Sequence, residues 1–295
     1  VLIPGVWRNI CPMASTALLP KKLKLSKGKR LSKEQQGWLY LAGVIALFLI
    51  VPMRHLILNT NGAATALMLL GALGIGLYMG RHFEWRSGWC ASACPIHSVE
   101  RLYGTTPLFT TDNAHCQSCE QCISLCPDAT KQMSASLTRN MPAERIAGTL
   151  MTGGFVGFIW GWYQVPDLTA SVSYSAIITA YGWPLGAAFL SLAVYLWLQR
   201  YISKKSKRLL DAIFATSAIA CYYWYRIPAL VGMGMFPGDG MLINLSSVLP
   251  TWFNHASQLT TTSFFIWFML IRAKSRQQHS WSIRPQYAFT IKNTN

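Results

Sequence analysis

The chain has 295 residues, of which 52% are hydrophobic and only 12% are charged. That charged fraction is about half of what an ordinary soluble domain carries, so composition overrules the two globular domains that length alone would suggest. The net charge of +16 would favour nucleic acid as the partner of a soluble protein, whereas in a membrane protein it reports topology. The composition therefore favours an integral membrane protein.

Six apolar runs approach the ~20 residues that an α-helix needs to cross a bilayer. They lie at about 38–57, 63–80, 146–165, 176–198, 209–226 and 250–271. We therefore predict an all-α integral membrane protein with about six transmembrane helices. The predicted organisation is an N-terminal segment (1–37), helices one and two (38–80), a connecting segment (81–145), helices three to six (146–271) and a C-terminal tail (272–295).

The basic residues fall in blocks between these predicted helices. Lys and Arg accumulate on the cytoplasmic side because basic loops resist translocation. The blocks before the first helix, between the fourth and fifth, and after the sixth are Lys21, Lys22, Lys24, Lys27, Lys29, Arg30 and Lys33; Arg200, Lys204, Lys205, Lys207 and Arg208; and Arg272, Lys274 and Arg276. We therefore predict that both termini and the 81–145 segment are cytoplasmic, and that the basic blocks contact anionic lipid rather than nucleic acid. The chain starts at Val1, which leaves an upstream segment open, and no secretory signal peptide is apparent.

Six of the eight cysteines lie in the segment between the second and third predicted helices. Four of them form the run Cys116-x2-Cys119-x2-Cys122-x3-Cys126-Pro127, the spacing by which bacterial ferredoxins hold iron-sulfur clusters through thiolates. A cytoplasmic location argues against disulfides. Zinc is the main alternative, because paired C-x2-C units also make tetrahedral sites, but four cysteines in this run with the terminal proline exceed what zinc needs.

A second fragment, GWCASACP, contains Cys90-x3-Cys94-Pro95 and reproduces the third and fourth positions of the same run. Glu84 and Ser87 stand where its first two cysteines would be, so this repeat cannot supply a full ligand set alone. Two-cluster ferredoxins share ligands in a crossed pattern. On that pattern a first [4Fe-4S] cluster is held by Cys94, Cys116, Cys119 and Cys122, in a small ferredoxin-like insert.

A second [4Fe-4S] cluster would use the remaining Cys90 and Cys126. The amino-terminal sequence WRNICP adds Cys11, which is again followed by a proline and lies on the predicted cytoplasmic side. Trp7 occupies the place where another cysteine would complete a C-x3-C-P unit. The fourth ligand is left open between an upstream residue, a partner's side chain, none at all as in a three-iron centre, His97 and His115.

The combination of GWCASACPIHSVERLYG with the C-x2-C-x2-C-x3-C-P run, between hydrophobic helices, resembles the membrane-bound polyferredoxins of nitrous oxide and periplasmic nitrate respiration, the NosR/NapH type. The likeness covers about residues 84–130. It implies a protein of the bacterial inner membrane that passes electrons between the quinone pool and extracytoplasmic reductases, or that supports assembly of metalloenzymes. Cys90 and Cys94 match the family's C-x3-C-P unit. The chain lacks a second complete ferredoxin run and a second complete C-x3-C-P unit.

Polar residues inside the predicted membrane helices are few, and their cost there makes them candidates for function. His55 lies near the outer end of the first helix, and Asn254, His255 and Gln258 lie near the outer end of the sixth. Quinone is one candidate ligand for these groups, and haem with His55 and His255 as axial ligands is a less favoured one. The alternative is that the histidines hydrogen-bond to headgroups or water. A pocket there would be separated from cytoplasmic clusters by most of a ~30 Å hydrocarbon core.

The hypothesis that unites these features is a membrane electron-transfer subunit that passes single electrons through one or two [4Fe-4S] clusters, between a cytoplasmic donor or the quinone pool and a partner redox complex. The sequence offers no nucleotide-binding glycine loop, catalytic triad or paired carboxylates, so we expect a subunit of an oxidoreductase complex rather than an independent enzyme. Expected partners are other membrane subunits, the lipid bilayer and a soluble ferredoxin-like donor. Two alternatives are an assembly factor that reduces a metal or disulfide for another membrane oxidoreductase, and a structural subunit with a vestigial ferredoxin segment.

Overall fold

The computed structural model describes residues 3–103, 108–109, 141–168, 172–203, 206–236 and 238–272. Helices make up 77% of these residues, and no strand occurs among them. The prediction of an all-α chain is therefore confirmed for the part that the structure describes. The four-cysteine run at 116–126 and His115 lie outside the described residues, so the ferredoxin-like insert stays a prediction.

Three helices of the described residues are long and apolar enough to cross a membrane, and they indicate a membrane protein. The first, Lys33–Leu58, consists of α3 (Lys33–Met53) followed by the π-helical turn η1 (Arg54–Leu58). The second is α4 (Gly62–His82), and the third is α8 (Tyr174–Tyr201). They cover the predicted helices at 38–57, 63–80 and 176–198.

The other three predicted membrane helices are also helical, but they are not among the three that meet both conditions. Their apolar runs are diluted by glycine in the first, by charge in the second and by Asn, Gln, Ser and Thr in the third. They correspond to α6 (Pro142–Thr149), η4 (Leu150–Gly154) and α7 (Phe155–Trp162), to α9 (Lys207–Leu230), and to α10 (Trp252–Ile266) with η5 (Trp267–Ile271).

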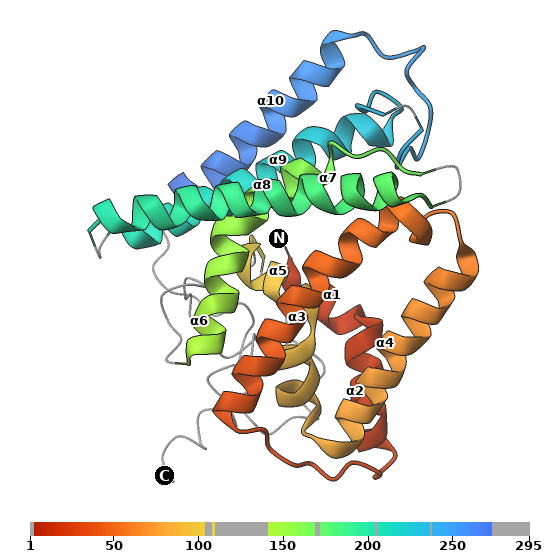
Figure 1. Cartoon of the computed structure of the whole chain (residues 1–295), viewed down its shortest axis with the longest axis vertical. Coiled ribbons are helices and arrows are strands. Elements are labelled where there is room, and N and C mark those ends of the chain that lie inside the picture. The colour runs from red at the N-terminus through yellow and green to blue at the C-terminus, as the bar shows by residue number, and fades with distance from the viewer. Residues whose placement is uncertain are drawn as a thin grey trace. The chain divides into compact units, whose positions relative to one another are not determined.

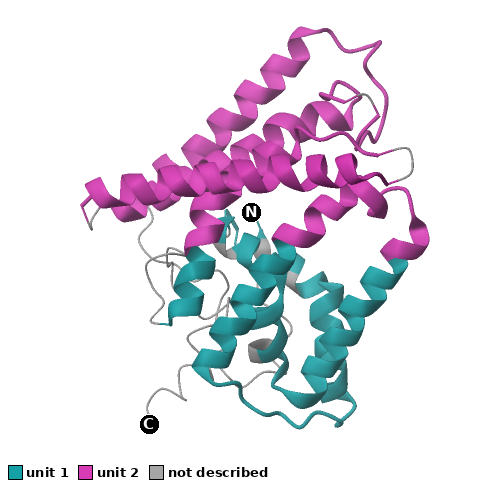
Figure 2. Cartoon of the chain, viewed as in Figure 1, with its two compact units in different colours: residues 1–47, 66–148, 277–295 teal, residues 48–65, 149–276 magenta. Residues whose placement is uncertain are grey.

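The chain divides into two compact units, coloured separately in Figure 2. Unit 1 consists of residues 1–47, 66–148 and 277–295, and unit 2 consists of residues 48–65 and 149–276. Unit 1 takes in α3 up to residue 47 and α4 from residue 66, together with most of α6. It also contains the short helices α1 (Pro4–Ile10), α2 (Pro12–Lys22) and α5 (Pro95–Tyr103), labelled in Figure 1, and the π-helical segment η2 (Arg86–Ala93).

Unit 1 depends on a close approach between α2 and α4. A Cβ atom added at Gly80 would lie 2.8 Å from the carbonyl carbon of Ala17 and closer still to its carbonyl oxygen, so only glycine fits there. Next to this contact, the segment before α3 runs along the end of α4. The Ser26 hydroxyl donates to the Gly80 carbonyl at 2.7 Å, and the backbone N–H of Lys27 donates to the Arg81 carbonyl at 2.7 Å. The N-terminal segment is therefore anchored to α4, one of the three helices long and apolar enough to cross a membrane.

Unit 2 is built around the packing of α7 against α8. Gly157 and Gly161 of α7 face the backbone of α8, and a Cβ at Gly157 would collide with the Ala187 carbonyl. Small residues let two helix backbones approach closely in membrane proteins. One turn earlier, the Ser191 hydroxyl of α8 donates to the carbonyl of Gly153 in η4, at 2.5 Å. Glycine therefore gives α7 a surface against which the backbone of α8 packs directly.

Candidate functional site

Three cysteines from distant parts of the sequence gather in one core cluster of unit 1. Cys94 is only 9% exposed and packs with Ala14, Ala17 and Leu18 of α2 and with Trp85 and Trp89. Cys11 and Cys90, both half-buried, pack against the same cluster. The fold thus brings together the predicted ligand Cys11 and the two cysteines of the C-x3-C-P unit, about eighty residues further along the chain.

The two described Cys-Pro pairs have the same backbone geometry. Cys11 has φ −61° and ψ 115° and joins α1 to α2, and Cys94 has φ −71° and ψ 116° and joins η2 to α5. A residue before proline is driven out of the helical region into extended geometry, and proline is well suited to the first position of a helix. Each cysteine is therefore placed by its own proline at the start of a new helix.

The environment of Cys94 acts on its thiol in two opposite ways. Burial raises its pKa to about 11. The backbone N–H groups of His97 and Ile96, at the start of α5, donate to the sulfur and lower the pKa, since they stabilise a thiolate. Burial dominates, so the thiol is protonated near neutral pH unless a cation lies beside it. Metal ligation would release this proton and use the two N–H groups.

The ligand set is incomplete within the described residues, where no group of three or more His, Cys, Asp and Glu side chains is arranged to hold a metal ion. Cys116, Cys119, Cys122 and Cys126 lie outside them. His97, left open as a ligand, is 3% exposed, and its Nδ1 lies 3.9 Å from the Glu100 carboxylate. Cys11, Cys90 and Cys94 alone do not make a metal-binding set, and their ligation of clusters together with the 116–126 run stays a prediction.

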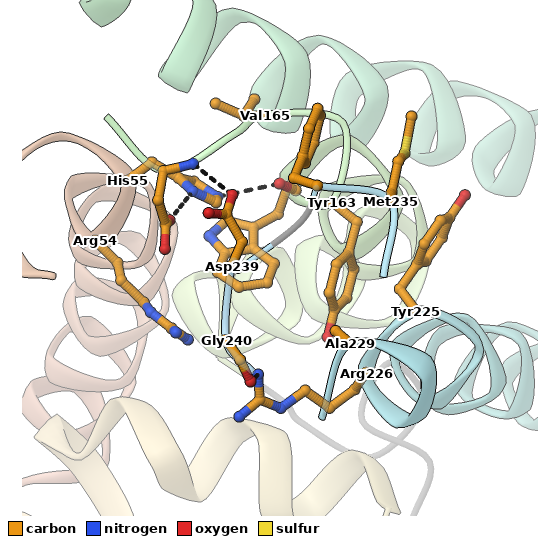
Figure 3. Close-up of a pocket in the computed structure, with 13 residues that line it drawn as sticks. Arg54, His55, Tyr163, Val165, Tyr225, Arg226, Ala229, Met235, Asp239 and Gly240 are labelled. Atoms are coloured by element: carbon orange, nitrogen blue, oxygen red, sulfur yellow. Dashed lines mark hydrogen bonds and ion pairs between the residues drawn. The ribbon is translucent and has the colours of Figure 1, made fainter. Parts of the chain in front are cut away.

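A second polar site lies in unit 2, around a cavity of about 40 Å³. Figure 3 shows its lining, which comes from η1, the end of α7 and the following loop, the end of α9, and residues 235, 236, 239 and 240. A space of this size holds one or two water molecules, and it is too small for a quinone ring. Charged side chains of both signs line it, namely Arg54, Asp167, Arg226 and Asp239, together with His55.

Both ring nitrogens of His55 are engaged within the chain. Nδ1 lies 2.7 Å from Oδ1 of Asp167, and Nε2 lies 3.1 Å from the carbonyl oxygen of Trp162. Carboxylates and carbonyls accept hydrogen bonds, and these two contacts occupy both ring nitrogens that a metal could use. Ligation of haem iron by His55 would require one of these bonds to break.

Asp167 links the loop after α7 to the rest of the site. Burial raises the pKa of its carboxyl, but hydrogen bonds from His55 and Asn59 and the charge of Arg54 more than offset this, so the pKa lies below its ordinary value. Its backbone N–H donates to Oδ2 of Asp239 at 2.7 Å, a contact drawn in Figure 3. The carboxylate is therefore ionised at neutral pH and joins η1 to both loops.

The polar residues predicted on the sixth helix do not line this cavity. In α10, the amide of Gln258 donates to the Trp224 carbonyl at 3.3 Å, and His255 is exposed. Asn254 Oδ1 is buried without a hydrogen-bond partner among the described residues. The cavity thus contains His55 but neither His255 nor Gln258, and quinone binding by these residues stays a prediction.

No family model, curated protein or solved structure matches this chain. Its function must therefore be argued from its own residues.

The sequence analysis missed two residues of the cavity, Asp167 and Asp239. A signal for them existed, because acidic residues are rare in this chain, ten in all, and each of the predicted outer loops at 164–175 and 227–249 contains one aspartate. Arg226, at the edge of the predicted fifth helix, donates to the carbonyl of Gly240 at 3.0 Å.

Proposed function

We propose that this chain is a multi-pass protein of the bacterial inner membrane that transfers single electrons through one or two [4Fe-4S] clusters on the cytoplasmic side, in the manner of the NosR/NapH-type polyferredoxins. The observation that carries the proposal is the C-x2-C-x2-C-x3-C-P run at 116–126. The gathering of Cys11, Cys90 and Cys94 in one core cluster supports it. So does the shared geometry of the Cys11 and Cys94 turns.

In this proposal, Cys94 joins Cys116, Cys119 and Cys122 on the first cluster. Cys90, Cys126 and Cys11 hold the second. A bound cluster supplies one-electron exchange, at a potential set by hydrogen bonds to sulfur and by exposure to water. Two features of the chain suit that role. The N–H groups of Ile96 and His97 point at the Cys94 sulfur, and the indoles of Trp85 and Trp89, almost fully buried, exclude water beside it.

The proposed topology has six transmembrane helices with the ferredoxin-like insert between the second and third. α3, α4 and α8 have the required apolarity, and α6 to α7, α9 and α10 complete the bundle. The blocks of basic residues support a cytoplasmic location for both termini and for the cysteine-containing segment. Electrons would pass between a cytoplasmic donor or the quinone pool and a partner redox complex.

The proposal is tested by anaerobic iron and sulfide quantitation with low-temperature electron paramagnetic resonance during a redox titration. Two clusters would give about eight irons per chain. Cys94→Ser should remove or alter the first centre, while Cys11→Ser should affect the second one alone. Cys221→Ser is the matched control, because Cys221 lies in α9 of unit 2 and is not part of the core cluster that contains the other three described cysteines.

Each result has a definite consequence. About four irons in the wild type, unchanged by Cys11→Ser, would limit the protein to one cluster held by Cys94 and the 116–126 run. Zinc without sulfide would overturn the electron-transfer proposal. Clusters that can be removed without loss of activity in any associated redox complex would instead make the segment vestigial.

A further inference from the structure

The segment that joins α2 to α3 is unusually basic. Residues 21–30, named here the basic strip, contain six basic and no acidic residues. All six basic side chains are exposed: Lys21, Lys22, Lys24, Lys27, Lys29 and Arg30. Between them, Leu23 is 58% and Leu25 is 56% exposed. Cationic and apolar side chains therefore share one surface, a combination that suits the boundary between headgroups and acyl chains.

Backbone hydrogen bonds hold the basic strip beside the last turn of α4. The N–H of Lys27 donates to the Arg81 carbonyl at 2.7 Å, and the N–H of Lys29 donates to the His82 carbonyl at 3.2 Å. The N–H of Glu84 in turn donates to the Lys29 carbonyl at 2.9 Å. These bonds use main-chain atoms only, so they leave the exposed ammonium groups of Lys27 and Lys29 in contact with solvent. The strip has a defined place at one end of a membrane-spanning helix.

Aromatic residues mark the depth of this end in the bilayer. Trp38, near the start of α3, and Tyr78, one turn before the end of α4, are each 59% exposed. Exposed Trp and Tyr side chains near the ends of membrane helices lie at the level of the headgroups. Lys33, at the start of α3, and Arg81, in the last turn of α4, come next toward the water. The basic strip continues this cationic layer.

We propose that the basic strip is a binding site for anionic phospholipid headgroups of the adjacent leaflet, with Leu23 and Leu25 entering the acyl boundary. Charge complementarity selects the occupant, since zwitterionic headgroups carry no net charge to pair with six cations. A lysine near an anionic surface strengthens association about fivefold. The proposal does not depend on iron-sulfur clusters, and it assigns a role to a segment that electron transfer leaves unused.

The test is a titration of the detergent-solubilised full chain with phosphatidylglycerol or phosphatidylcholine, with bound lipid counted by native mass spectrometry. The wild type should bind phosphatidylglycerol more tightly. Lys27→Gln with Lys29→Gln should weaken phosphatidylglycerol binding by about 25-fold and leave phosphatidylcholine binding unchanged. The matched control, Lys27→Arg with Lys29→Arg, keeps both charges and the backbone bonds and should bind as the wild type does.

A second control, Arg200→Gln with Arg208→Gln, removes two exposed charges from unit 2. These two residues belong to another basic block, whose contact with lipid is separate from the strip, so their loss should change the tightest phosphatidylglycerol binding less than twofold. An equal loss in this control would overturn the proposal, because the effect would then be one of net charge. Equal affinity of the wild type for the two lipids would also overturn it, as would binding of a soluble acidic protein or nucleic acid in place of phosphatidylglycerol. Unchanged iron content in all variants separates this test from that of the proposed function.

Discussion

Replacing Gly80 with valine should lift α2 from α4 and expose the thiol of Cys94. A Cβ at this position would lie 2.8 Å from the carbonyl carbon and 3.1 Å from the Cα of Ala17. Both sides of the contact are helix backbone, which cannot turn aside as a flexible side chain would. Overpacking of a well-packed site costs about 1–3 kcal/mol, and here the cost falls on the docking of α2.

That free energy corresponds to a roughly 5- to 150-fold larger population in which α2 is detached. Because α2 supplies Ala14, Ala17 and Leu18 to the core around Cys94, detachment opens the thiol to reagents. We therefore expect maleimide to alkylate Cys94 faster by a factor in that range. The rate is measured on protein freed of iron by a chelator, because a cysteine bound to iron does not react with maleimide. Alkylation is followed by peptide mass spectrometry at neutral pH and compared with that of Cys221 in the same sample.

The chain offers matched controls on the same helix. A Cβ added at Gly71 or Gly74 meets nothing within 4 Å, so Gly71→Val and Gly74→Val change the composition of α4 equally without touching α2. Both should leave the alkylation rate of Cys94 at the wild-type value. A wild-type rate in Gly80→Val, or equal acceleration in Gly71→Val, would refute the claim that the contact with Ala17 holds α2 over Cys94.

Two further predictions concern unit 2, each read out by thermal unfolding of the detergent-solubilised protein. The lowered pKa of Asp167, which hydrogen bonds from His55 maintain against burial, stabilises the fold above the unfolded-state pKa of about 3.9. This stability is lost as the pH falls through the lower folded value. The unfolding temperature of the wild type should therefore fall as the pH drops below about 4, and it should fall less in Asp167→Asn. The same fall in both proteins would contradict a stabilising role of the ionised Asp167. Gly157→Ala drives a Cβ into the Ala187 carbonyl and should cost about 1–3 kcal/mol, whereas Gly182→Ala, in open space, should not destabilise; equal midpoints would refute the packing argument.

The positions of the helices were predictable because apolarity is a local property of the chain. The runs at 63–80 and 176–198 are found as Gly62–His82 and Tyr174–Tyr201, each slightly longer at both ends. The number of helices that are both long and apolar enough to cross a membrane was harder to predict, since six were predicted and three of the described helices meet both conditions. The apolar helix α7 has only eight residues and follows the polar α6, which contains Glu144 and Arg145. Its glycines Gly157 and Gly161 serve the close packing of α8 against its backbone, a contact that hydropathy does not include.

For the candidate sites, the sequence identified the residue types that could bind a ligand, but it did not show which distant residues they contact. The repeated Cys-Pro pair related Cys11 to Cys94 through the sequence alone, because proline imposes the same local geometry on both. The role of His55 could not be inferred in this way. Its partner, Asp167, lies 112 residues further along the chain, and without that carboxylate a histidine near the end of a membrane helix looks like a free ligand.

The sequence by itself therefore indicated the membrane class, the helical ranges, the basic blocks and the spacing of the cysteine run, all of which depend on composition and order over short distances. Only the tertiary structure decided that Cys11 packs beside Cys94, that the basic strip lies along the end of α4, and that His55 is occupied by acceptors. Each of these depends on close backbone contacts, as at Gly80, or on hydrogen bonds between distant segments. Such contacts form only when the chain has folded.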